Sequence, residues 1–204
     1  MNIGGAIITL VIILFSMMLH ELAHGYVAYL LGDTTAKDDG RLTLNPLKHL
    51  DLYMSIILPM ILYFIGAPIL GGAKPVPVNS RNLKGREWGM ALVALAGPLT
   101  NFLLAFISFM VWYWTRGEAS FMLQAMSVNL GFMIFNLLPI PPLDGSRILY
   151  ALSPDGVRVA LLSMERYGIF MVYVLILVLG GVFSNFMVNI MNDIYQFFCM
   201  IVGL

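Results

Sequence analysis

The sequence predicts an all-α polytopic membrane protein, with about four to six transmembrane helices and a re-entrant or β-like element near its candidate site. The first observation is composition: of 204 residues, 60% are hydrophobic and 11% charged, and the mean hydropathy is +0.88. Soluble domains carry about 25% charged residues. The second observation is that several apolar runs reach the roughly 20 residues that a helix needs to cross a bilayer core.

The first apolar run covers residues 3–31, and Gly32 and Asp33 end it. We expect a resident transmembrane helix here, not a cleavable signal peptide, because a basic n-region and a small-residue cleavage site are both missing. A polar loop over residues 33–51 follows and carries three basic residues.

The second apolar stretch, residues 52–70, is interrupted by Pro59, Gly66 and Pro68. It separates two basic loops, and the positive-inside rule places both of them in the cytoplasm, with the N-terminus outside. A single crossing by residues 52–70 would put the loops on opposite sides. A re-entrant hairpin bent at Pro59 or Gly66 resolves this conflict, since irregular backbone is tolerated where protein or water covers it.

The remaining spans follow a clear order. Residues 88–114 form an uninterrupted apolar run, and another begins at residue 120 and reaches a proline-rich break at residues 139–142. The helix is expected to resume over residues 146–152, and a last span runs over residues 167–181. Together these elements form one membrane-embedded domain over residues 1–204, with a core at 3–152 and C-terminal helices at 165–204.

The tail over residues 184–204 carries a polar stripe on an otherwise apolar helix, because its polar side chains recur every three or four residues. They are Asn185, Asn189, Asn192, Asp193 and Gln196. The favoured interpretation is an interfacial helix that lies flat with this stripe toward water. The alternative is a helix that lines a wet cavity.

Composition also excludes some classes of function. The formal net charge is zero, so nucleic acid is not an expected partner. The single Cys199 excludes an internal disulfide.

The chemistry is carried first by His20, Glu21 and His24, which form the pattern H-E-x-x-H inside the first apolar run. On a helix, residues i and i+4 share one face, so both imidazoles can ligate one Zn²⁺ ion. Glu21 is placed to act as general base toward water. Ionisable groups within a membrane span are costly and usually functional, which favours a site over a packed polar patch.

Two histidines leave a catalytic zinc one protein ligand short. Of the eleven carboxylates, Asp144 alone lies deep in a membrane segment and beside a helix break. Taken alone, Asp144 followed by Gly145 reads as a turn, but beside an incomplete zinc site it is the candidate third ligand. His49 lies in a polar loop and is expected to be an interfacial residue, not a ligand.

Several stretches together resemble the site-2 protease family (peptidase family M50), in its short prokaryotic form without PDZ or CBS domains. The resemblance covers roughly residues 16–152. The matching stretches are His20–His24, Gly40–His49, Ala73–Asn79, Ala96–Asn101, Asn136–Pro139 and Leu143–Gly145.

The resemblance implies an intramembrane zinc metalloendopeptidase that cleaves membrane-spanning proteins and holds one Zn²⁺ per chain through His20, His24 and Asp144. It implies that Glu21 is the catalytic base and that Asn136 belongs to the active site, where an amide can steady the substrate carbonyl. The cell membrane is then the location, with the active site toward the cytoplasm, and the partners are a transmembrane protein substrate and the lipid bilayer.

Substrate binding is assigned to Val76, Val78 and Asn101. The prolines around the two valines favour an extended chain, whose edge could pair with an unwound substrate by strand addition, although prolines leave part of that edge without donors. A rigid loop without substrate contact is an equal alternative. Two other functional classes stay open: a metal-binding membrane transporter or channel, and a scaffold without catalysis.

Overall fold

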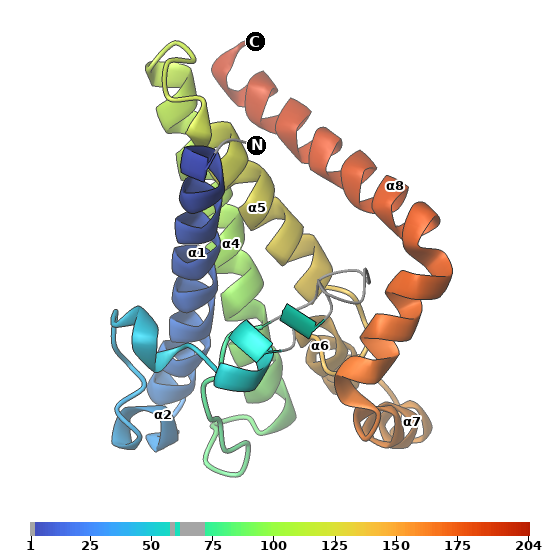
Figure 1. Cartoon of the computed structure of the whole chain (residues 1–204). Coiled ribbons are helices and arrows are strands. Elements are labelled where there is room, and N and C mark those ends of the chain that lie inside the picture. The colour runs from blue at the N-terminus through green and yellow to red at the C-terminus, as the bar shows by residue number, and fades with distance from the viewer. Residues whose placement is uncertain (1–2, 58–59, 62–71) are drawn as a thin grey trace.

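The computed structural model describes residues 3–57, 60–61 and 72–204 (Figure 1). The described residues form helices and loops and include no strand. The long helices are α1 (Ile3–Leu30), α4 (Glu87–Trp114), α5 (Phe121–Asn136) and α8 (Gly168–Val202). The short ones are α2 (Thr35–Asp38), η1 (Pro46–Lys48), η2 (Leu52–Ile57), α6 (Asp144–Leu152) and α7 (Asp155–Glu165).

The polytopic membrane architecture is confirmed. Within the described residues, α1, α4 and α8 are long and apolar enough to cross a membrane, and α5 is a shorter apolar helix. Helix α4 is central, because it packs against α1, α5 and α6 (Figure 1). Helix α4 is therefore a direct neighbour of α1, α5 and α6 alike.

The apolar core lies where α4, α5 and the end of α8 meet. Phe109 of α4, Leu130 of α5 and Phe198 of α8 are completely buried there. Phe109 and Phe198 contact each other with ring centroids 5.5 Å apart. Removing such a ring from a core costs about 3–5 kcal/mol, so this cluster fixes α4, which packs against the helix that carries His20 and His24.

The C-terminal tail differs from the favoured expectation. Residues 184–202 are not a separate flat helix but continue α8, which does not end at Gly180 and Gly181. The apolar side of the tail packs on the core cluster through residues such as Met187, Ile194 and Phe198. The physical reason is that burial of these large apolar side chains against α4 and α5 is favourable.

The break between α5 and α6, at residues 137–143, includes the expected proline-rich segment at residues 139–142. Helix α6 begins at Asp144, two residues before the predicted position. A Cβ on Gly145 would collide with the backbone carbonyls of Leu137 and Leu138. Glycine is therefore required for α6 to start against the end of α5, and this close approach turns the first residue of α6 toward α1.

Asp33 ties the loop after α1 to the loop before α4. Its carboxylate is completely buried and accepts hydrogen bonds from Thr35, from the backbone N–H of Asn79 at 2.6 Å and from the side chain of Asn82 at 3.1 Å. Burial alone would raise the pKa of Asp33, but these hydrogen bonds hold the pKa below its ordinary value. Asp33 is thus a structural anion.

Residues 72–78 form a loop without regular secondary structure. They lie beside α1, since Val76 is buried and a Cβ on Gly25 would come within 2.9 Å of its side chain. The predicted hairpin bends at Pro59 and Gly66 lie outside the described residues.

Candidate metal centre

His20, His24 and Asp144 meet at one point between α1 and α6. Asp144 Oδ2 lies 3.2 Å from His20 Nε2 and 3.3 Å from His24 Nε2, and the two Nε2 atoms are 3.0 Å apart. One ligand atom from each residue falls within 4.8 Å of the others. The histidines are buried and the carboxylate is half-buried, so the structure brings together the three residues that the sequence singled out.

Both imidazoles are held by their other ring nitrogen. His20 Nδ1 lies 2.5 Å from Asn101 Oδ1, and His24 Nδ1 lies 2.7 Å from the carbonyl oxygen of Val93. Both acceptors belong to α4 and require a proton on Nδ1. The tautomer that satisfies them leaves each Nε2 lone pair free and aimed at Asp144, which is the usual way that proteins orient metal-ligating histidines.

Asn101 is itself fixed by the helix behind it. It is completely buried, and its Nδ2 donates to Asn129 Oδ1 at 2.9 Å. Asn129 in turn donates to the carbonyl of Ala125 at 2.8 Å. This line of hydrogen bonds crosses α1, α4 and α5, so the direction of the His20 ring depends on how all three helices pack.

Gly97 of α4 lies directly beneath the two imidazoles. A Cβ built there would come within 2.5 Å of His20 Cε1 and within 2.5 Å of His24 Nε2. Even the smallest side chain would therefore occupy the space of the ligands. Gly97 permits the close approach of α1 and α4 that lets Val93 and Asn101 reach the ring nitrogens.

The donor set fits a zinc ion. Asp144 Oδ2 is buried and has no hydrogen-bond donor among the described residues, although it points at two imidazole nitrogens. An orphaned buried carboxylate oxygen is costly unless a cation or a donor meets it. A catalytic zinc site commonly has three protein ligands, such as two histidine nitrogens and one carboxylate oxygen, and water or substrate takes the fourth position.

Glu21 lies next to this cluster and contacts the loop of residues 72–78. Its Oε2 accepts a hydrogen bond from the backbone N–H of Val76 at 2.8 Å. Arg41 holds the same segment, because its Nη2 donates to the carbonyls of Lys74 at 2.7 Å and Pro75 at 3.3 Å. The orientation of Glu21 is thus connected to the loop after α1 through three backbone groups of residues 74–76.

The other predicted residues lie in different settings. Asn136 is the last residue of α5, and its Nδ2 donates to the carbonyl of Phe132 at 3.0 Å. Val78 is partly buried against a second apolar cluster formed by Ala28, Leu83 and Val93. His49 is buried, bonds to the carbonyl of Thr43 at 2.9 Å and is not part of the metal-ligating group.

Sequence reasoning did not assign roles to Gly97, Val93 or Asn129. Gly97 carried a signal only through the motif around it. Val93 contributes a backbone carbonyl, for which a sequence holds no side-chain signal. Asn129 was detectable only as an amide within an apolar run.

Comparison with known proteins decides the family. The model of "Peptidase family M50" matches residues 8–119 and 113–180. The chain belongs to peptidase family M50. The motifs quoted for the resemblance therefore identified the family, and its zinc metalloprotease relatives support a zinc protease here.

Three relatives of this M50 chain illustrate the range of similarity. "Putative zinc metalloprotease YwhC" of Bacillus subtilis (strain 168) is 43% identical over 184 residues, covering 84% of this chain and 79% of the relative. "Putative zinc metalloprotease Rip2" of Mycolicibacterium smegmatis is 34% identical over 173 residues, covering 80% of this chain and 64% of the relative. "Putative zinc metalloprotease MJ0611" of Methanocaldococcus jannaschii is 32% identical over 152 residues, covering 70% and 69%. No solved structure matches the chain.

Proposed function

We propose that this chain is an intramembrane zinc metalloendopeptidase that hydrolyses peptide bonds of membrane-spanning proteins. The observation that carries the proposal is the meeting of His20, His24 and Asp144, with both Nδ1 atoms anchored and one carboxylate oxygen left without a donor. Helices α1 and α4, which supply and support the histidines, are long and apolar enough to span a membrane. Substrates within the bilayer are therefore the natural class.

In the proposed site, His20, His24 and Asp144 would hold one Zn²⁺, and the ion would supply Lewis-acid chemistry toward the scissile carbonyl and the attacking water. Glu21 takes the proton from the attacking water and returns it to the leaving amine nitrogen. A carboxylate one residue after His20 is suited to this because it shares the site without being needed as a ligand. Its Oε2 first has to exchange the Val76 N–H for water.

Asn101 supports His20 and does not contact the substrate in this proposal, because it is completely buried and its amide bonds to Asn129. Asn136 remains the candidate that steadies the substrate carbonyl. For that role its amide must leave the Phe132 carbonyl, to which it donates at 3.0 Å. The half-buried position of Asn136 at the end of α5 makes such a rotation feasible.

The loop at residues 75–78 is the proposed binding edge for an unwound substrate. A helical substrate hides its amide groups, so cleavage requires a locally stretched chain. Val76 is well placed to contact such a chain, because its backbone already reaches Glu21. We further propose that the N-terminus lies outside and the metal centre toward the cytoplasm, as the basic loops indicate; reporter fusions to each loop test this orientation.

The first test is zinc content of the detergent-purified chain by inductively coupled plasma mass spectrometry. We expect about one zinc per chain in the wild type, and sharply less in His24→Ala and in Asp144→Ala. Full zinc in Asp144→Ala would refute the third ligand. Absence of zinc in the wild type after supplementation would refute the protease proposal.

The second test separates a protease from a metal transporter. Glu21→Gln keeps the shape of the side chain and all three proposed ligands, so its zinc content should equal that of the wild type. In proteoliposomes containing a panel of single-span membrane proteins, wild type should release fragments that mass spectrometry detects, and Glu21→Gln should release none. Zinc flux across the vesicle membrane that survives Glu21→Gln would favour the transporter.

A further inference from the structure

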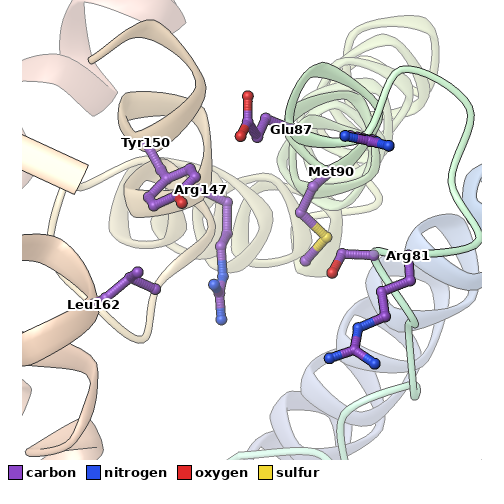
Figure 2. A pocket seen from close by; sticks show the side chains of 8 residues that line it. Arg81, Glu87, Met90, Arg147, Tyr150 and Leu162 are labelled. Atoms are coloured by element: carbon purple, nitrogen blue, oxygen red, sulfur yellow. The ribbon is translucent and has the colours of Figure 1, made fainter. Parts of the chain in front are cut away.

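A basic pocket of about 460 Å³ lies away from the metal centre, between the loop before α4, the first turns of α4, α6 and α7 (Figure 2). Three arginines line it: Arg81 from the loop, Arg86 just before α4 and Arg147 from α6. Glu87 is the one carboxylate among the described lining residues, so three positive charges minus one negative leave a net charge of +2. The lining therefore favours an anion.

Two of these arginines have no acidic partner in the part of the chain that the structure describes. Among the described residues, Arg147 pairs with Glu165 and Glu87 pairs with Arg158 at 3.4 Å, whereas no ion pair involves Arg81 or Arg86. The carboxylates near the pocket are thus already engaged. The guanidinium groups of Arg81 and Arg86 are left to water or to a ligand that brings its own negative charge.

The pocket lies at the start of a helix that is long and apolar enough to cross a membrane, which is where lipid headgroups are expected. Helix α4 is one of the spanning helices, and the arginines surround its first residue, Glu87. The neighbouring Trp88 is 57% exposed, and exposed tryptophans are typical of the membrane–water interface. Helix α7 flanks the pocket with Leu162 and exposes further apolar side chains, which suits a helix in contact with the interface.

The chemistry of the lining suits a phosphate group with an apolar neighbour. Guanidinium groups bind phosphate oxygens through paired N–H donors, more specifically than an ammonium does. The remaining wall is formed by Met90, Tyr150 and Leu162, against which glycerol and the first acyl carbons can pack. In Figure 2, Arg147 and Arg81 extend from opposite sides of the pocket, so that one ligand could contact both.

We propose that this pocket binds the phosphate of an anionic ligand, and that its place at the membrane surface favours the headgroup of an acidic phospholipid. The bound phosphate replaces water at Arg81 and Arg86 and competes with Glu165 for Arg147. Because α6 carries both Arg147 and Asp144, occupancy also adds a contact to the helix on which the proposed third metal ligand lies. The binding itself does not depend on zinc or on catalysis.

The test uses the full chain, delipidated in dodecyl maltoside, and isothermal titration calorimetry with three probes. Dioctanoyl phosphatidylglycerol should bind, and dioctanoyl phosphatidylcholine should bind at least about tenfold more weakly because its headgroup is zwitterionic. Glycerol 3-phosphate distinguishes a soluble phosphate compound from a lipid as the source of the phosphate. If it binds as tightly as phosphatidylglycerol, the pocket holds a soluble phosphate. If it binds far more weakly, the pocket holds a lipid. Absence of binding by both anionic probes would overturn the proposal.

The variant Arg81→Gln/Arg86→Gln should weaken binding of the anionic probe by about tenfold or more, since two charge-assisted contacts are lost. The matched control Lys37→Gln/Arg116→Gln removes the same charge from exposed positions outside the pocket and should leave the affinity unchanged. An equal loss of affinity for the anionic probe in both variants would show a general effect of charge and would refute the proposed phosphate site. Arg147→Lys keeps the positive charge but loses the paired N–H donors of the guanidinium. It should weaken binding of the anionic probe while the chain keeps the circular dichroism spectrum of the wild type.

Discussion

Gly97→Ala is the smallest substitution that tests the geometry of the metal centre. The new Cβ would lie 2.5 Å from His20 Cε1 and from His24 Nε2, whereas ordinary contact begins near 3.4 Å, so the rings or α4 must move by roughly 0.9 Å. Zinc–ligand distances tolerate about 0.2 Å. Because loss of a single supporting group costs about 10–100-fold in metal affinity, displacement of two ligands should weaken zinc binding by about 100-fold or more, or about 2.7 kcal/mol.

The assay is competition for zinc against a fluorescent chelator in detergent. The matched control is Gly131→Ala, another glycine inside a membrane helix, where a Cβ meets nothing within 4 Å. Alanine favours a helix over glycine by about 1 kcal/mol, so this control should keep its zinc affinity and melt no lower than wild type. A zinc affinity in Gly97→Ala equal to that of wild type would refute the reasoning, because it would mean that the imidazoles do not occupy the space above Gly97 when zinc is bound.

Three further predictions follow from the hydrogen bonds around the site. Asn101→Ala removes the acceptor for His20 Nδ1 and should lower zinc affinity by about 10–100-fold in the same competition assay; unchanged affinity would exclude the supporting role. Arg41→Gln releases the backbone that carries Val76 and should lower the rate of fragment release while the zinc content stays at one per chain; loss of zinc as well would place Arg41 in the metal centre instead. Asp33 has a folded pKa below its ordinary value of about 3.9, so its contribution to stability is present above about pH 4 and is lost as the pH falls further. The melting temperature of wild type should therefore drop below pH 4, whereas Asp33→Asn should melt lower at pH 7 and change less with acid; parallel curves for the two proteins would contradict this.

The main spans and the candidate ligand pair could be predicted from local sequence. Length and hydropathy define a membrane helix, because the bilayer sets how many apolar residues are needed. The spacing of His20 and His24 places both rings on one face of any helix they form. Asp144 could be named by elimination, since few carboxylates lie inside apolar segments, and the structure places it 3.2 and 3.3 Å from the two histidines.

The tail and the supports of the site could not be predicted in this way. The polar stripe of residues 184–204 has the same period in a flat helix and in the continuation of α8. Burial of Phe198 against Phe109, 89 positions earlier in the chain, decides between them. Periodicity describes one helix at a time, whereas burial depends on which other helix supplies the facing surface.

The sequence by itself therefore determined the class of protein, its main spans and the residues with the chemistry to bind zinc and move a proton. Only the tertiary structure decided that α4 holds both imidazoles, through the Asn101 side chain and the Val93 carbonyl, and that the Val76 amide covers Glu21. The physical reason is that a residue's type and spacing are local properties, whereas a backbone donor or acceptor is the same at nearly every position. Which of these groups meets a side chain of the candidate site is set by how closely the helices approach, and Gly97 permits that approach between α1 and α4.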